Sequence, residues 1–222
     1  MSRGLRFMRR SWRTLPIAII LSLALLGKSE GRLQSGCNPE SVGVDTSLAT
    51  TSGELIWGMA WGQTFVAKDT LIESVTVWRI APEHSDPSGM KFWITEVDSG
   101  GTPHTHLVVY EGPIISVVSP DSTRPTKIEY VFDPPVSLPR PSVYCFWIQE
   151  VCTGYVDLLI NQNDQYAGGQ LWNTFRSDFD GCILRDYPRT IALDDLVFTL
   201  EFCDTTTPVK TTTWGRLKTI YR

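Results

Sequence analysis

Aromatic rings stand among amide and carboxylate side chains between positions 161 and 193, which makes this segment the part of the chain best suited to binding. Tyr166 and Trp172 flank Gly168 and Gly169, a pair that permits a sharp turn. An aromatic face covers the apolar C–H groups of a sugar ring, while amides and carboxylates bond its hydroxyls. The pattern predicts a site for a carbohydrate or another cell-surface ligand, with candidate residues Asn161, Asn163, Asp164, Tyr166, Gln170 and Trp172. The alternative left open is that both rings pack against the body of the protein.

Catalytic motifs are not found in the sequence. It holds no G-x-S-x-G nucleophile elbow, no H-E-x-x-H and no phosphate-binding glycine loop. The chain has only three histidines, so few residues could act as the base of a His-containing catalytic triad. His104 and His106 could face one side of a strand, but zinc needs three or four ligands, so solvated histidines are the preferred interpretation. We therefore expect a protein that is not an enzyme.

Calcium is the one ion for which the sequence offers weak candidates. Asp178 and Asp180 precede Gly181, and calcium takes six to eight oxygen ligands. Aspartates that form a turn explain the same pattern equally well. We expect no other cofactor.

Five cysteines follow the first thirty residues, which is an odd number. Cys145 and Cys152 would lie roughly 23 Å apart on one extended strand, well beyond the separation of about 7 Å that a disulfide tolerates. We therefore expect the pairs Cys152–Cys182 and Cys37–Cys203. Cys145 is expected to remain unpaired and buried as a small hydrophobic residue.

The first thirty residues have the three parts of a secretory signal peptide. Five arginines between Arg3 and Arg13 precede an unbroken apolar run from Leu15 to Gly27, and small and polar residues follow. The run is shorter than the roughly 20 apolar residues that a membrane span needs. We expect residues 1–30 to be removed and the mature chain, which has no second long apolar run, to lie in the medium, at the cell surface or in the periplasm.

Charge divides the remaining chain into an acidic body and a basic tail. Residues 31–203 carry 10 Lys and Arg against 22 Asp and Glu, a net charge of −12, whereas residues 204–222 have a net charge of +3. An acidic body argues against nucleic acid as a partner, because phosphates demand a basic face. Residues 204–222 begin as a Thr/Pro linker and end with Trp, Leu and Tyr side chains. Two interpretations stay open for this tail: a frayed terminus, or a peptide that docks on a partner or serves in sorting.

Short strands separated by turns account for the body. Leu71–Ile80 and Thr126–Phe132 show the enrichment or alternation that is typical of strands, and Val143–Val151 is apolar enough to be buried on both faces. Turn-forming clusters such as Asp133–Pro135 separate these runs. We expect residues 31–203 to form a single all-β domain, a two-sheet antiparallel β-sandwich that is jelly-roll-like.

Several phrases, among them GQTFVAKDTLIESVTVWRI, LPRPSVYCFWIQ, DQYAGGQLW and DLVFTLEFC, resemble a group of uncharacterised secreted bacterial β-sandwich proteins. That group is distantly like carbohydrate-binding modules, and its resemblance to this chain covers about residues 37–203. The closing TTTWGRLKTIYR is similar to a short W-G-x-L-K-x-x-Y-R tail suggestive of a sorting signal. The resemblance implies the fold and implies no catalytic residues.

Taken together, these patterns predict a secreted, non-catalytic binding module that holds a carbohydrate or another surface ligand through its 161–193 segment. The alternative is a structural or adhesive cell-surface protein that is displayed or sorted through its C-terminal tail and has no small ligand.

Overall fold

The computed structural model describes residues 38–56, 58–80, 89–116, 124–151, 154–174, 184, 188–191 and 193–204. All of them belong to one compact unit, residues 35–222. The predicted signal peptide, Cys37, Cys152, Cys182, Asp178 and Asp180 lie outside the described residues. Within the described residues, no helix is both long and apolar enough to cross a membrane.

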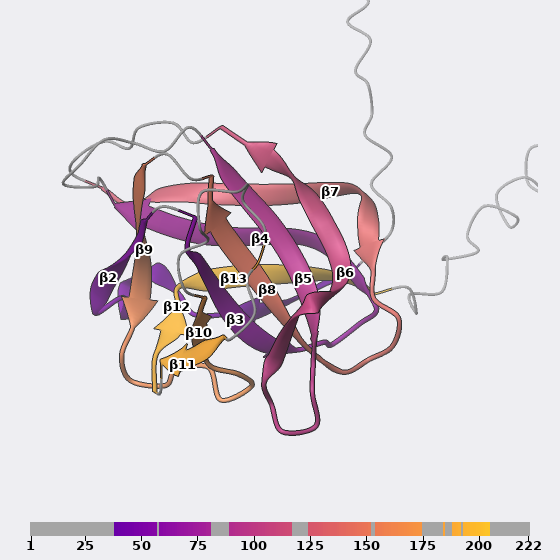
Figure 1. Ribbon diagram of the computed structural model, residues 1–222. Helices are drawn as coiled ribbons and strands as arrows, with labels where there is room; N and C mark the ends of the chain where they lie inside the picture. The colour runs from indigo at the N-terminus through magenta and orange to yellow at the C-terminus, as the bar shows by residue number, and fades with distance from the viewer. Residues whose placement is uncertain are drawn as a thin grey trace, which may run out of the picture. The chain divides into compact units, whose positions relative to one another are not determined.

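Two antiparallel sheets form the unit, and Figure 1 shows the six-stranded sheet in front of the seven-stranded one. A single 3-10 turn, Thr46–Leu48, is the only helical element among the described residues. The seven-stranded sheet holds β1 (Asn38–Gly43), β2 (Thr51–Ile56), β4 (Leu71–Ile80), β7 (Thr126–Ser137), β9 (Tyr155–Asn161), β12 (Asp195–Leu196) and β13 (Phe198–Asp204). The six-stranded sheet holds β3 (Ala60–Val66), β5 (Met90–Val97), β6 (Pro103–Ile115), β8 (Val143–Glu150), β10 (Leu171–Asn173) and β11 (Arg189–Ile191).

Eight of these strands pair in a nested order. β5 pairs with β6, β4 with β7, β3 with β8 and β2 with β9, each antiparallel. The inner and outer pairs alternate between the two sheets, which is the arrangement of a jelly roll. β13 pairs with β4 on one side and with β1 on the other. The end of β4, at Arg79 and Ile80, also pairs with β9. The structure therefore confirms the predicted all-β, jelly-roll-like sandwich.

The core lies between the sheets because each strand turns alternate side chains inward. Phe65 of β3 contacts Tyr144, Phe146 and Phe202, with ring centroids 6.1–6.2 Å apart. All four side chains are at most 1% exposed. Burial of each such ring contributes about 1.5–3 kcal/mol to folding.

The strand β8 is buried on both faces, as its apolar sequence predicts. Phe146 points into the core, while Cys145 and Trp147 belong to a second cluster with Ala60, Trp93 and Trp172. The indole Nε1 of Trp147 donates to Thr95 Oγ1 at 2.9 Å. This cluster lies on the outer face of the six-stranded sheet, because its members alternate with the side chains that point into the core.

Candidate functional site

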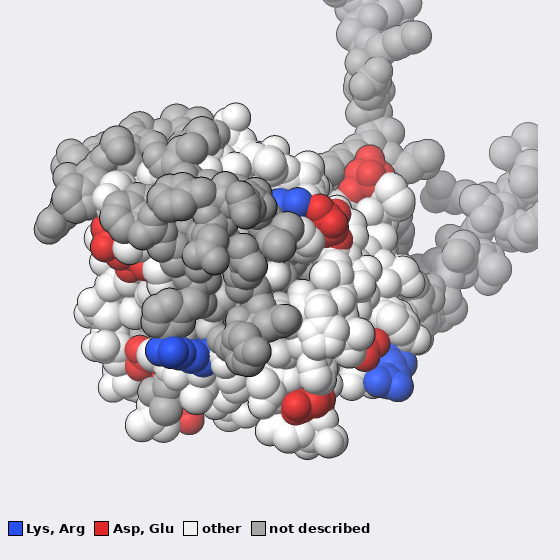
Figure 2. All heavy atoms as spheres, viewed as in Figure 1, with Lys and Arg blue, Asp and Glu red and all other residues white. Residues whose placement is uncertain are grey.

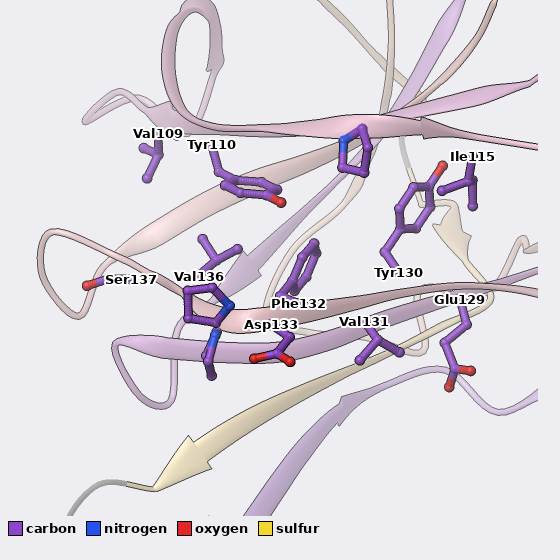
Figure 3. Close-up of a pocket in the computed structure, with 13 residues that line it drawn as sticks. Val109, Tyr110, Ile115, Glu129, Tyr130, Val131, Phe132, Asp133, Val136 and Ser137 are labelled. Carbon is purple, nitrogen blue, oxygen red and sulfur yellow. The ribbon is translucent and has the colours of Figure 1, made fainter. Parts of the chain in front are cut away.

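An open groove lies between β6 and β7, the edge strands of the two sheets. It has a volume of about 550 Å³, and its lining residues come from 109–115 of β6 and 129–137 of β7 (Figure 3). Among the described strands, β6 pairs only with β5 and β7 pairs only with β4. The groove therefore lies where the jelly roll is open along its side.

A bulge in β7 shapes one wall of the groove. Ile72 of β4 pairs with Val136, but Ser74 pairs with Val131, so β7 carries three more residues than β4 over this stretch. The extra residues include Pro134 and Pro135, which have no N–H to donate to a neighbouring strand. The sequence cluster Asp133–Pro135, expected to be a break between strands, is instead a bulge inside β7 that opens toward the groove.

A smaller bulge in β6 shapes the opposite wall. Lys91 of β5 pairs with Ile114 and Trp93 pairs with Glu111, which leaves one extra residue in β6. Pro113 lies within this stretch and lines the groove. Prolines in both edge strands thus interrupt the pairing at the same site.

Aromatic rings form the floor of the groove. Tyr110 of β6 meets Phe132 of β7 edge-on, with ring centroids 5.2 Å apart. Phe92 lies beneath them in the core, 5.4 Å from Phe132 and 4.9 Å from Tyr130. Tyr110 is half-buried, so part of its ring is available to a ligand, whereas Phe132 and Tyr130 are buried.

The hydroxyl of Tyr130 is buried without a hydrogen-bond partner. It points from β7 across toward β6 near Ile115 (Figure 3). Burial raises the pKa of Tyr130, so the hydroxyl stays neutral and keeps both its donor and its acceptor capacity. An unsatisfied buried polar group costs about 1–3 kcal/mol, and a group of this kind calls for an explanation in a native structure.

Carboxylates and a hydroxyl form the rim. Glu129, Asp133 and Ser137 are exposed and line the groove. Glu129 Oε1 forms an ion pair with Lys127 Nζ at 2.9 Å, while Asp133 has no ion-pair partner among the described residues. Among the described residues visible in Figure 2, the basic side chains lie apart from one another.

Tyr166, one of the two aromatic candidates from the sequence, packs at the edge of the core. Its ring meets Phe198 edge-on at 5.3 Å, and its hydroxyl accepts a hydrogen bond from the Val66 N–H at 3.2 Å. Burial raises the pKa of Tyr166, with a further contribution from the charge of Asp195. The ring is therefore engaged with the protein on its edge and at its hydroxyl.

Trp172, the other aromatic candidate, is only 6% exposed. It lies in the cluster on the outer face of the six-stranded sheet, whereas its neighbour Leu171 and Tyr166 pack with the core between the sheets. Successive side chains of a strand point to opposite faces, which separates the two clusters. The structure thus does not bring Tyr166 and Trp172 together as one open aromatic platform.

The polar candidates from the sequence divide into structural and exposed groups. Asn161 is 2% exposed; its amide donates to the carbonyl of Leu48, and its Oδ1 accepts from the Asn163 N–H at 2.7 Å. The Gln170 carbonyl accepts from the N–H of Thr64 on β3 at 3.1 Å. The side chains of Asn163 and Asp164 are exposed, and Asp164 has a φ of 47°. Asn161 and Gln170 therefore help to hold the segment in place.

Among the described cysteines, Cys145 is a buried free thiol, as expected, and burial raises its pKa. Cys203 is disulfide-bonded. In the antiparallel pair of β1 and β13, Cys203 is opposite Pro39, two residues after Cys37. The pairs Cys37–Cys203 and Cys152–Cys182 remain predictions because Cys37, Cys152 and Cys182 lie outside the described residues.

Metal candidates from the sequence find no support in the described part of the chain. His104 and His106 lie with ring centroids 5.3 Å apart, and His104 Nε2 is 4.0 Å from Asp98 Oδ2. No group of three or more His, Cys, Asp or Glu side chains able to hold a metal ion occurs among the described residues. Asp178 and Asp180 lie outside them.

Sequence reasoning missed the groove residues Tyr110, Tyr130 and Asp133. A signal was present, because the phrases YEGP and YVFDPP each place aromatic residues just before prolines within a strand-like run. A proline in such a run is typical of an edge strand or a bulge. The sequence did not show which strands pair, and this pairing places the edge strands β6 and β7 opposite each other.

The fold and the groove define an open-sided jelly-roll sandwich with an aromatic and acidic edge site. Comparison of the chain with protein-family models, with curated proteins and with solved structures found no match.

Proposed function

We propose that this protein is a secreted, non-catalytic binding module that holds a carbohydrate in the groove between β6 and β7. The observation that carries this proposal is that one open groove combines the half-buried ring of Tyr110 with the carboxylates of Glu129 and Asp133. Aromatic faces suit the apolar faces of sugars, and carboxylates accept hydrogen bonds from their hydroxyls. The volume falls in the range of about 300–1,000 Å³ that is typical of ligand sites.

The proposal keeps the ligand class inferred from the sequence and changes the site. Trp172 is buried and Tyr166 is engaged with Val66 and Phe198, so the described residues 161–174 offer less aromatic surface than their composition suggests. The Tyr130 hydroxyl adds support, because a ligand that reached it would satisfy a group that the protein leaves unpaired.

The test is binding of soluble polysaccharides and a glycan array to the wild type and to single variants. Tyr110→Ala and Asp133→Asn should each weaken binding by about tenfold or more, equivalent to about 1.4 kcal/mol. Tyr130→Phe removes only the orphan hydroxyl and should weaken binding less. Asn163→Ala, an exposed change in the 161–193 segment, is the matched control and should leave affinity unchanged.

Two results would count against this proposal. Loss of binding in Asn163→Ala with unchanged binding in the groove variants would return the site to the 161–193 segment. Absence of binding to every glycan would remove carbohydrate as the ligand class.

A structural or adhesive role at the cell surface is the second candidate function. Leu107, Val108 and Ile114 on the edge strand β6 are 42–55% exposed, and exposed apolar side chains on an unpaired edge favour contact with another chain. Deletion of residues 205–222 followed by localisation of the protein tests the display mechanism. Unchanged release into the medium would count against it.

A further inference from the structure

The basic tail, residues 205–222, is the sequence feature that the proposed function leaves unused. It follows Asp204, the last residue of β13, and lies outside the described residues. It has four basic residues and no acidic one. Its basic residues are Lys210, Arg216, Lys218 and Arg222, and its large apolar residues are Trp214, Leu217, Ile220 and Tyr221.

The strand order places the start of this tail near one end of the groove. Phe202 of β13 pairs with Ile72 of β4, and Ile72 pairs with Val136 of β7, which lines the groove. Neighbouring strands are about 4.8 Å apart, so Val136 lies about 10 Å from Phe202. Asp204 comes two residues later, at the same end of the sheet as Ser137.

The tail has the length to reach and fill the groove. Residues 205–211, rich in Thr, can span up to about 23 Å when extended, which exceeds the distance to the near end of the groove. Residues 212–222 then match the stretch 129–137 of β7 that lines it. A segment entering at Ser137 and continuing toward Glu129 would run antiparallel to β7, whose outer edge is unpaired among the described strands.

The chemistry of the two surfaces is complementary. The rim of the groove carries Glu129 and Asp133, and Asp133 has no ion-pair partner among the described residues. Arg216 and Lys218 supply the opposite charge. The apolar residues around them suit a floor made by Tyr110 and Phe132 and walls that contain prolines.

We infer that residues 212–222 dock in the β6–β7 groove of their own chain and compete there with the carbohydrate. The docking itself rests on the groove geometry, whereas the competition rests on the proposed function. A tail that occupies the groove nine-tenths of the time weakens the apparent affinity for the sugar by about tenfold, because only the open fraction binds.

Zero-length cross-linking of the full chain with a carbodiimide tests the docking. The reagent joins a lysine amine to a carboxylate in contact with it, and mass spectrometry of the digest locates the link. We expect Lys218 to be joined to Asp133 or Glu129, and the yield to fall about tenfold in an Asp133→Asn, Glu129→Gln double variant. Glu54→Gln, an exposed acid on β2, is the matched control and should not change the yield.

A mixture of unlabelled and nitrogen-15-labelled chains identifies the occupant. Links within one chain support the inference. Links only between light and heavy chains would overturn it in favour of a second copy of the protein. Links from Lys218 spread evenly over surface acids, Glu54 included, would overturn docking altogether.

Glycan binding by the full-length variant Trp214→Ala, Leu217→Ala separates the two proposals. Affinity about tenfold higher than that of the wild type supports competition. Glycan binding that is unchanged, without a groove cross-link, overturns the docking and leaves the proposed function standing. A groove cross-link in a protein that binds no glycan overturns the proposed function and the competition and leaves the docking standing.

Discussion

Gln63 and Asp195 join the two sheets through a hydrogen bond in the interior, in which Gln63 Nε2 donates to Asp195 Oδ1 at 2.9 Å. The Leu196 N–H donates to Gln63 Oε1 at 2.9 Å, and the Tyr166 N–H donates to Asp195 Oδ2 at 2.8 Å. Both side chains are fully buried. Their polar atoms therefore depend on each other and on these backbone groups, and the pair holds β12 and the chain near Tyr166 against β3.

Replacement of Gln63 by Leu should destabilise the protein by about 2–4 kcal/mol. The change leaves the Asp195 carboxylate and the Leu196 N–H short of partners, and each unsatisfied buried group costs about 1–3 kcal/mol. Urea denaturation monitored by circular dichroism measures the loss. Gln162→Ala, at an exposed position, is the control and should change stability by less than about 0.5 kcal/mol. A Gln63→Leu protein as stable as the wild type would contradict this account.

Asp195 should make stability depend on pH. Burial raises its pKa above the ordinary value of 3.8, and hydrogen bonds from the Tyr166 N–H and the Gln63 amide offset part of the effect. As pH rises from 3.8 through the folded-state pKa, the unfolded chain loses its proton first, so the wild type loses stability. Asp195→Asn cannot titrate. The unfolding free energy of the wild type minus that of the variant should therefore fall between acidic and neutral pH, and a difference independent of pH would refute the assignment.

Gly169 should tolerate no side chain. A Cβ at this position would lie 1.8 Å from the backbone carbonyl oxygen of Thr64, an atom that cannot rotate away. The Gln170 N–H also donates to Thr64 Oγ1 at 2.8 Å, so this stretch is held tightly against β3. Gly169→Ala should cost about 2 kcal/mol or more, a fall in Tm of about 4–8 °C for a chain of this size. Gly100→Ala, whose Cβ would lie 3.2 Å from the side chain of Asp98, is the milder comparison in the same thermal melt.

Cys145 should be inert in the folded protein. Its thiol is fully buried, and burial raises its pKa, so little reactive thiolate forms. Alkylation by iodoacetamide should be at least about 100-fold slower in buffer than in urea, because reaction waits for the sandwich to open. Mass spectrometry of the peptide that holds Cys145 measures both rates. Equal rates would show that the second cluster does not protect it.

The strands that the sequence predicted well are those whose apolar pattern matches the burial of their side chains. Leu71–Ile80 matches β4 at both ends, and the apolar run that begins at Val143 is β8, buried on both faces as expected. No strand was predicted at β1 or β2. Much of the β2 side-chain surface is half-buried or exposed, and both strands pair with partners far away in the sequence. Pro134 was misleading because a strand tolerates a proline where no N–H is needed, and Pro134 lies in the bulge where β7 does not pair with β4.

The candidate site was harder to predict than the fold because composition does not determine which way a ring faces. Trp172 and Tyr166 stand six residues apart among amides, yet they pack in different clusters. The groove instead depends on Tyr110 and Asp133, which come from different sheets and meet only through the long-range order of the strands. Local patterns therefore indicated only a class of ligand, which stays a prediction, whereas the groove itself follows from the order of the strands.

The nested strand pairs have a consequence for how the polypeptide acquires its shape. Val97 pairs with Pro103 across a tight turn, whereas Thr51 must find Ile160 across most of the domain. Closure of a long loop costs more entropy than closure of a short one. We therefore expect the β5–β6 hairpin to form first and the pairs that enclose it to form later, with β2–β9 last. Pulsed hydrogen exchange during refolding should protect amides of β5 and β6 before those of β2 and β9. During synthesis, β2 would accordingly remain unpaired until β9, its partner, has left the ribosome.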